Sequence, residues 1–436
     1  MAVSSPALTE ALSDAVGREQ VIDAPAALER HAVDGVTPRF IVRPGSVDEV
    51  GRVMALAHTE RLAVSPRGTG SALALGNPPR RLDVVVDRSR LDAVTEYVPE
   101  DMVASVEAGL SLARLGGRLA ASNQMLALDP IGGSARSVGG VLATNASGPL
   151  RFRYGTARDL TLGVRFVQAD GTITWGGAKV VKSVTGYDVP KLFVGSLGTL
   201  GIIVGATLRL HPLPPARGSW RIAWKTHEAM DGFVAALLAT SLEPDRVTLL
   251  NVDASRTLGY PGEGGTLLIS FGSVAEAVSS QGQAMTRLAR GHGGHVQDVP
   301  NACWDELGGV LAGPVVLRVA GEPKRVVSWL AEVERLASRT PCQVSCVAQA
   351  GAGVIQCAIH GEVTATSLDE DILRPLREGL GGEGGSVVVE RAPASLKSGC
   401  DVWGAITADS LTIMSRLKSE FDRQATLNPG RFVGGL

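Results

Sequence analysis

Residues 129–148 constrain the chain most, because glycines and small polar residues fill this stretch, Asp-Pro-Ile-Gly-Gly-Ser-Ala-Arg-Ser-Val-Gly-Gly-Val-Leu-Ala-Thr-Asn-Ala-Ser-Gly. Glycine adopts positive φ and lets a ligand approach the backbone closely. A segment of this kind can surround a large ligand with main-chain N–H groups. A flexible surface loop is the alternative, although linkers rarely enclose an apolar run such as residues 141–143. The stretch therefore predicts one wall of a ligand site.

Bulk properties narrow the class of protein. A length of 436 residues indicates two or three domains, and a net charge of −2 argues against a nucleic-acid partner. The sequence contains no apolar run of about 18 residues, so no membrane-spanning helix is predicted. The first residues lack the pattern of a secretory signal. The five cysteines lack iron–sulfur spacing and fit a reducing compartment. We therefore expect a cytoplasmic protein.

A second glycine-rich turn follows the strand expected at residues 62–65. It reads Pro66-Arg67-Gly68-Thr69-Gly70-Ser71. Such a turn can bind a phosphate through backbone N–H groups, and Arg67 could add a positive charge; a surface position is the alternative for Arg67. The pattern Gly-x-Gly-x-x-Leu, interrupted by glycine and prolines at 76–79, disfavours an NAD-type Rossmann fold.

Residues 186–210 form a third block with a short helix at 189–193, a glycine loop at 195–201 and a long strand at 202–210. Three prolines within residues 212–215 mark a domain boundary. We expect an α+β protein with a cofactor-binding domain at 1–214, a second α+β domain at 215–400, and a C-terminal helix and tail at 401–436 that return to the first domain.

The second domain shows strands alternating with helices, which predicts one sheet covered by helices. The expected strands are 220–224, 248–252, 266–271, 315–319, 344–348 and 354–359, and the expected helices are 227–240, 274–290, 324–338 and 368–379.

Five motifs together carry a family resemblance. They are Arg67-Gly68-Thr69-Gly70, Ser137-Val138-Gly139-Gly140, Gly186-Tyr187-Asp188, Gly195-Ser196-Leu197-Gly198-Thr199-Leu200-Gly201-Ile202 and Leu427-Asn428-Pro429-Gly430-Arg431-Phe432. In this order the chain resembles the FAD-binding PCMH-type flavoproteins of the vanillyl-alcohol-oxidase superfamily. Within that superfamily it is similar to the E-type subunits of bacterial glycolate oxidases, also called glycolate dehydrogenases.

The resemblance implies a PCMH-type FAD-binding domain of two α/β subdomains, and FAD as the cofactor. It also implies an oxidoreductase acting on CH–OH donors, here a small 2-hydroxy acid. The implied partners are a second FAD-binding subunit and an iron–sulfur subunit, with peripheral contact to the inner face of the cell membrane through these partners. The implied FAD-binding residues are Arg67, Gly68, Thr69, Gly70, Ser71, Gly133, Ser137, Gly139, Gly140, Thr144, Asn145, Gly148, Gly198, Gly201, Ile203 and Asn428. A turn-forming role before Pro429 is the alternative for Asn428.

The sequence departs from its relatives in two places. Leu197 stands where the family often has a glutamate, so one hydrogen bond to the cofactor is lost. The loop at 67–71 contains no histidine, so FAD is expected to bind noncovalently.

The catalytic residue stays unknown, because the His-x-x-Gly-Asp-Gly-Asn-x-His segment of hydroxyacid-oxidising relatives is missing. No metal site is expected. His360, His292 and His295 have no obvious partners, and Cys342 and Cys346 are interpreted as buried thiols. The cations that could bind a carboxylate are Arg318, Arg374, Arg391 and Lys397.

Three functions remain open at this point. The first is an FAD-binding subunit that oxidises glycolate to glyoxylate and passes the electrons to an iron–sulfur partner. The second is a non-catalytic structural subunit of the same complex. The third is a stand-alone FAD-dependent oxidase of another alcohol or 2-hydroxy acid.

Overall fold

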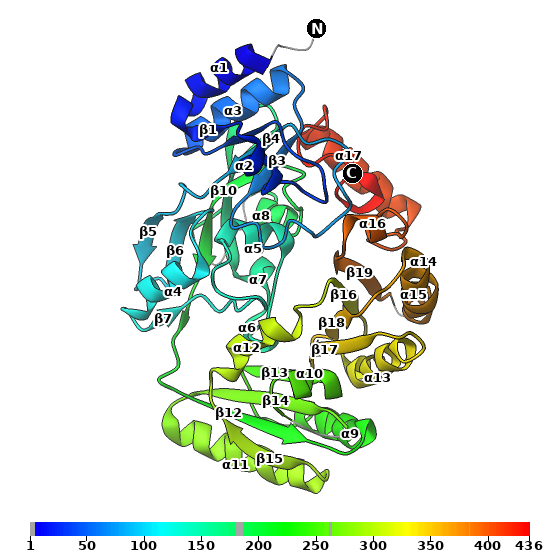
Figure 1. The fold of residues 1–436 in the computed structure, drawn as a ribbon. Coiled ribbons are helices and arrows are strands. Elements are labelled where there is room, and N and C mark those ends of the chain that lie inside the picture. Colours follow the sequence, from blue (N-terminus) through cyan, green and yellow to red (C-terminus); the bar gives the residue numbers. More distant parts are fainter. Residues whose placement is uncertain (1–4, 180–185, 261–263, 383) are drawn as a thin grey trace.

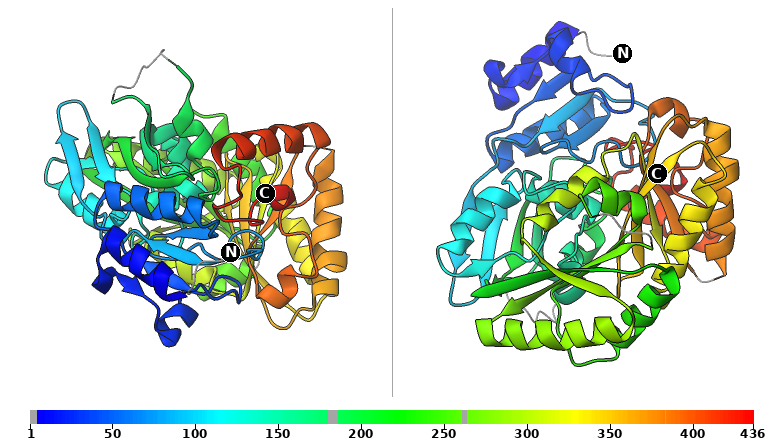
Figure 2. Two further views of the ribbon diagram at one scale, coloured as in Figure 1. Left: turned by 90° about the horizontal axis from the view of Figure 1, so that it is seen from above. Right: turned by 60° about the horizontal axis from the view of Figure 1, so that its bottom comes forward.

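The computed structural model describes residues 5–179, 186–260, 264–382 and 384–436. Three main sheets form an α+β fold, which confirms the expected class. Figures 1 and 2 show the first sheet and its helices at one end of the molecule and strands β12–β15 of the third sheet at the other. Among the described residues, no helix combines the length and apolar character needed to cross a membrane.

The first sheet has four short, valine-rich strands in the order β1-β2-β4-β3. They are β1 (Val21–Ile22), β2 (Phe40–Val42), β3 (Val64–Arg67) and β4 (Val84–Asp87). Strand β4 lies parallel to both β2 and β3. The crossover from β2 to β3 is helix α3 (Val47–Thr59), and α1 (Ser5–Val16) packs beside it. Ser46 caps α3, because its hydroxyl accepts a hydrogen bond from the Glu49 N–H.

The second sheet is antiparallel, with the order β5-β6-β10-β8-β9. Its strands are β5 (Val94–Val98), β6 (Val103–Glu107), β8 (Thr161–Val167), β9 (Ile173–Gly177) and β10 (Ile202–Arg209). Strand β5 was not expected. Helices α4 (Leu112–Ala120), α5 (Val138–Thr144) and α8 (Val189–Phe193) cover this sheet and share one apolar core with it.

The third sheet is an eight-stranded antiparallel sheet in the order β15-β12-β14-β13-β17-β18-β16-β19. Its strands are β12 (Ala216–Ala223), β13 (Arg246–Leu250), β14 (Thr266–Ser273), β15 (His295–Val299), β16 (Val315–Ala320), β17 (Gln343–Gln349), β18 (Val354–His360) and β19 (Ser386–Arg391). Two four-stranded halves meet where β13 pairs with β17. The two edge strands, β15 and β19, were missed by the sequence prediction.

Four helices pack against one face of the third sheet and share an apolar core with it. They are α9 (His227–Leu238), α11 (Ala275–Gly291), α13 (Val326–Ala337) and α15 (Arg374–Gly381). The expected helix at 368–379 begins as one π-helical stretch, Leu368–Leu373, before α15. The other face is covered only in part, by α10 (Val252–Thr257) and α12 (Cys303–Val310), which were not expected.

The C-terminal helix α17 (Ala408–Phe421) returns to the first half of the chain (Figure 1). Phe421 at its end packs against Phe166 and Phe193 of the second sheet and its helix. The tail then lies beside β3, where Leu427 bridges to Val64. The limits of the three proposed domains at residues 214 and 400 stay predictions.

Candidate functional site

The first cavity begins where strand β3 ends. Arg67 is the last residue of β3, and the glycine-rich turn follows directly. Gly70 has φ +80°, a conformation that favours glycine. A Cβ atom on Gly68 would lie 2.0 Å from the Ser137 hydroxyl oxygen. Glycine at this position therefore lets the turn pack directly against the start of α5.

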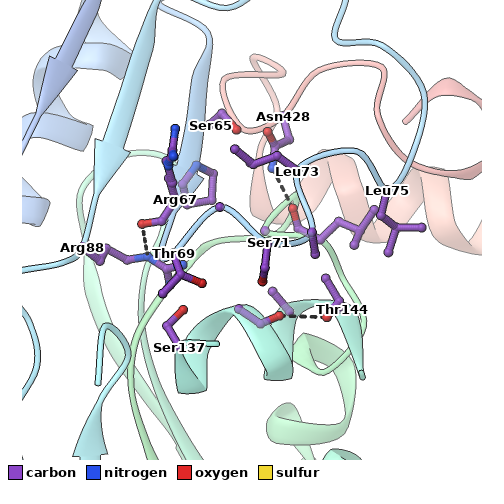
Figure 3. Close-up of a pocket in the computed structure, with 18 of the residues that line it drawn as sticks. Ser65, Arg67, Thr69, Ser71, Leu73, Leu75, Arg88, Ser137, Thr144 and Asn428 are labelled. Atoms are coloured by element: carbon purple, nitrogen blue, oxygen red, sulfur yellow. Dashed lines mark hydrogen bonds between the residues drawn. The ribbon is translucent and has the colours of Figure 1, made fainter. Parts of the chain in front are cut away.

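The second wall is a helix rather than the loop that the glycines indicated. Val138, Val141 and Leu142 recur at helical spacing and are buried against the second sheet, so residues 138–144 form α5. On the opposite side of α5, Gly140 faces the cavity, and a Cβ atom there would meet only the Ser137 hydroxyl, at 3.0 Å. Figure 3 shows Ser137 and Thr144 on this helix, facing the turn.

The third wall joins the glycine loop after α8 to the C-terminal tail. Leu197, Gly198 and Asn428 all have positive φ, at +53°, +68° and +44°. The Asn428 side-chain amide donates to the Leu197 carbonyl at 2.6 Å. Lys418 of α17 donates to the carbonyls of Thr199 and Leu427, at 2.8 and 2.9 Å. The tail thus fixes the backbone of this loop, as well as closing the cavity (Figure 3).

The walls line a cavity of about 70 Å³ that is open to solvent and carries unused polar atoms. Four buried polar atoms of lining residues have no hydrogen-bond partner in the described part of the chain: Ser65 Oγ, Ser137 Oγ, Asn428 Oδ1 and Arg431 Nη1. Buried polar groups in proteins are nearly always satisfied. Donors and acceptors of this kind, between glycine turns, fit a polar ligand with a phosphate chain.

Two buried arginines belong to this cavity and were not expected. Burial lowers the pKa of Arg88 and of Arg431 to about 10 each, so both guanidinium groups stay charged at neutral pH. Arg88 donates to the carbonyls of Arg67 and Ile203, which ties the first sheet to the second. No local motif marked Arg88, since it follows an ordinary strand. Arg431 stood inside the recognised Asn-Pro-Gly-Arg motif.

The structure brings eleven of the sixteen expected cofactor residues together around this cavity: Arg67, Gly68, Thr69, Gly70, Ser71, Ser137, Gly140, Thr144, Gly198, Ile203 and Asn428. Asn145 lines a neighbouring cavity instead. The remaining four, Gly133, Gly139, Gly148 and Gly201, line neither cavity.

Three of these four glycines serve packing. A Cβ atom on Gly139 would lie 2.7 Å from the Ala108 Cβ, one on Gly148 would lie 1.7 Å from the Asp129 carbonyl oxygen, and one on Gly201 would lie 2.9 Å from the Phe193 ring. Gly133 is exposed, with φ +98° and no atom near its absent side chain. The glycine pattern therefore combines residues that face the cavity with residues that let elements approach each other.

A second cavity, of about 500 Å³, adjoins the first. Both cavities are lined by Ser71, Ala72, Leu75 and Thr144. The far wall is the uncovered face of the third sheet. Along β16, Val315, Leu317 and Val319 point into the helix-covered core, while Val316, Arg318 and Ala320 line the cavity, as the two-residue period of a strand requires.

The second cavity is rich in positive charge. Arg136 and Arg151 come from the first half of the chain, whereas Arg318 and Arg391 come from the third sheet. Among the described residues, Glu390 is the one carboxylate in its lining. Its Oε1 lies 3.0 Å from Arg318 Nε, and its Oε2 accepts a 2.7 Å hydrogen bond from the Gln356 side chain.

Arg151 is one of the arginines that line this cavity. Its side chain donates a 3.4 Å hydrogen bond to the Ser147 hydroxyl. Burial, and then the like charge of Arg318 across the cavity, lower the pKa of Arg151. Two guanidinium groups that line one cavity and repel each other favour an anion between them.

The other residues considered from the sequence lie elsewhere. His360, His292 and His295 line neither cavity, and no cluster of three His, Cys, Asp or Glu residues suited to a metal occurs in the described residues. Arg374 pairs with Asp369 on the surface. Cys346 is a buried thiol as expected, but Cys342 is only partly buried, which corrects the interpretation of that residue. Of the four expected cations, Arg318 and Arg391 reach the second cavity.

Known proteins resemble this chain in sequence and in fold. Residues 38–177 match the family model described as "FAD binding domain". The chain is 23% identical to glycolate oxidase subunit GlcD of Bacillus subtilis, over 90% of this chain and 88% of that protein. It is 31% identical to a probable mitochondrial D-lactate dehydrogenase of Danio rerio over 64% of this chain and 58% of that protein. A D-2-hydroxyglutarate dehydrogenase of Xanthomonas citri pv. viticola is 31% identical, over 52% of this chain and 49% of that protein.

Solved structures share the fold along nearly the whole chain. An alkyldihydroxyacetonephosphate synthase superimposes with a TM-score of 0.77 and 18% identity, over 99% of this chain and 86% of that one. A p-cresol methylhydroxylase with bound substrate superimposes with a TM-score of 0.77 and 15% identity, over 98% of this chain and 97% of that one. With this FAD binding domain at residues 38–177 and its oxidoreductase relatives, the chain is an FAD-dependent oxidoreductase, and it has the fold of these solved structures.

Proposed function

We propose that the first cavity binds FAD and that the second cavity holds a small 2-hydroxy acid. Glycolate, with glyoxylate as its product, is the substrate expected from the sequence. The observation that carries the proposal is the wall shared by the two cavities, because ligands in both would lie against each other. Relatives named for glycolate, D-lactate and D-2-hydroxyglutarate support the substrate class.

The proposal assigns FAD contacts to the eleven expected residues that line the first cavity, with Arg88 and Arg431 added. The unpaired atoms Ser137 Oγ and Asn428 Oδ1 support this assignment, because a bound cofactor would give them partners. Asn145 would contact the cofactor from the side of the second cavity. Gly133, Gly139, Gly148 and Gly201 would support the shape of the loops. Noncovalent binding stays a prediction.

In the second cavity, arginines would bind the carboxylate of the acid. A guanidinium group matches a carboxylate through two parallel hydrogen bonds. Arg151 and Arg318 both line this cavity, and their repulsion would be relieved by a carboxylate between them. This pair therefore orients the substrate and selects for acids over neutral alcohols.

Glu390 would accept the proton of the substrate hydroxyl as the carbonyl forms. A general base must come within hydrogen-bond reach of that proton. The Arg318 and Gln356 side chains hold the Glu390 carboxylate at the cavity wall, beside the proposed carboxylate anchor. Bound FAD supplies the acceptor for the two electrons and the hydrogen that leave the substrate carbon.

The proposal also includes a complex. One relative that covers most of this chain is named as a subunit of glycolate oxidase, which supports a multi-subunit assembly. We propose a second FAD-binding subunit and an iron–sulfur subunit as partners, which would receive the electrons and provide any contact with the cell membrane.

A non-catalytic structural subunit is the second candidate. One observation favours it: the lining of the second cavity contains no histidine among the described residues, although histidine is the side chain most often used to transfer protons near neutral pH. Leu197 at the family's glutamate position agrees with this candidate.

Anaerobic reduction of the bound flavin tests the proposal. The FAD-loaded protein should lose the absorption of oxidised flavin when glycolate, D-lactate or D-2-hydroxyglutarate is added, whereas acetate, which lacks the hydroxyl, should leave it unchanged. Flavin that stays oxidised with all three hydroxy acids would contradict the proposal and favour the structural subunit.

A further inference from the structure

Residues 71–77, here called the partition segment, separate the two cavities. Ser71, Ala72 and Leu75 line both cavities, Leu73 lines only the first and Ala74 only the second. The segment belongs to no helix or strand. Its position must therefore be set by contacts other than a regular backbone ladder.

Two buried cations bind four consecutive carbonyl groups of the partition segment in alternation. Arg431 donates through Nη2 to the carbonyls of Leu73 and Leu75. Lys397 donates through Nζ to the carbonyls of Ala74 and Gly76. Hydrogen bonds from charged donors are stronger than those between neutral groups. These contacts replace the ladder that the segment lacks.

The Lys397 site is fully enclosed. The Lys397 side chain is 0% exposed, and the Asp34 carboxylate, 5% exposed, accepts from Nζ at 2.9 Å through both oxygens. Burial lowers the pKa of Lys397, and the Asp34 charge opposes that shift. An ammonium and its carboxylate are costly to bury, and removal of one partner leaves the other as an uncompensated buried charge, which destabilises the fold.

The two cations come from the two sides of the site. Lys397 ends α16 (Ala394–Lys397), shortly after β19 with its cavity residues Glu390 and Arg391. Arg431 follows Asn428 in the tail that closes the first cavity. A shift of either element is therefore transmitted to the same four carbonyl groups.

We propose that Lys397 and Arg431 are positioning residues that clamp the partition segment, and that this clamp couples FAD retention to the shape of the second cavity. The inference rests on the proposed function for the identity of the two ligands. A purely structural buried ion pair is the competing explanation. It would lower the stability of the fold without changing ligand affinity in the folded protein.

Lys397→Met removes the donor and keeps the length of the side chain. The matched control is Lys324→Met, since the Lys324 side chain is 78% exposed. The comparison is made at a temperature where circular dichroism shows both variants fully folded. There, Lys397→Met should raise the dissociation constant for FAD about tenfold or more. Lys397→Arg, which keeps the charge, should recover part of the affinity, and Lys324→Met should match the wild type.

Hydrogen exchange of flavin-free protein gives a readout that needs no cofactor. Amides within residues 71–77 should exchange faster in Lys397→Met than in the wild type, with no change in the strands of the third sheet. If Lys397→Met does not fold, Asp34→Asn replaces it as the milder change, with the same expected direction. Arg431→Met should also weaken FAD binding. The double variant should lose less FAD-binding free energy than the sum of the losses in the two single variants.

The possible results distinguish a failure of the proposed clamp from a failure of the proposed function. Unchanged FAD affinity and unchanged exchange at 71–77 in a folded Lys397 or Asp34 variant would overturn the clamp. Strictly additive effects of the Lys397 and Arg431 variants would also contradict it. If the wild type itself fails to retain FAD, the proposed function fails, while the exchange measurement still decides whether the clamp holds the segment.

Discussion

Gly140 leaves room for a ligand in the first cavity and does not pack in the protein core. It lies on α5 with one side toward the first cavity, where an added Cβ atom meets only the Ser137 hydroxyl. Its neighbour Gly139 has the opposite surroundings, because an added Cβ atom there would collide with Ala108. Adjacent glycines in one motif therefore have different reasons to be glycine, which the sequence pattern could not separate.

Gly140→Val should abolish FAD retention while leaving the fold intact, because the branched side chain would occupy ligand space rather than core space. We expect less than about a tenth of the wild-type flavin content after purification. Gly116→Val is the matched control, since Gly116 is an exposed helical glycine with no atom near its Cβ position. Wild-type flavin content in Gly140→Val would exclude α5 from the FAD site.

The element at residues 129–148 is a turn, the helix α5 and a return segment, and not one wrapping loop. Helix formation was hidden because glycine has low helix propensity, yet burial of Val138, Val141 and Leu142 outweighs that cost. Asp129, at the start of the element, attaches it to the third sheet. Its carboxylate accepts from Arg246 Nε of β13 at 3.0 Å and from the Leu150 N–H at 2.9 Å.

This attachment should make stability depend on pH. Burial raises the pKa of Asp129 to about 6, although Arg246 opposes the shift. The folded state then holds the proton more tightly than the unfolded state, so ionisation costs stability as pH rises from about 4 to about 6. Relative to Asp129→Asn, the wild type should lose at most about 3 kcal/mol of unfolding free energy across that range.

Denaturant unfolding at several pH values measures this difference. Asp14→Asn, at an exposed position, is the control and should show no such trend. A wild type that gains stability relative to Asp129→Asn between pH 4 and pH 6 would show that the Arg246 pair outweighs burial.

At the scale of the whole molecule, local patterns predicted the elements better than they predicted the site. Six strands of the third sheet follow from runs of β-branched residues. The edge strands β15 and β19 were missed, and β15 is largely polar because much of it faces solvent. The glycine turns around the first cavity could be recognised because turn chemistry depends on neighbours in sequence.

The second cavity could not be predicted in the same way. It depends on Arg151 and Arg318, far apart in sequence, lining the same cavity, and on the hydrogen bond from Gln356 to Glu390 of another strand. No spacing in the sequence encodes those contacts. The clamp on residues 71–77 was hidden for the same reason, since Lys397 and Arg431 reach it from more than 300 positions away.

The most direct test of the two-cavity site is an oxalate titration of the FAD-loaded protein, followed by its visible absorption spectrum. Oxalate resembles a small 2-hydroxy acid but cannot be oxidised by loss of a C–H hydrogen. If the arginine cavity opens onto the flavin, oxalate should perturb the flavin bands in a saturable way, and Arg318→Gln should weaken its binding by about tenfold or more. Retained flavin whose spectrum does not respond to oxalate at any concentration would contradict the shared wall between the cavities.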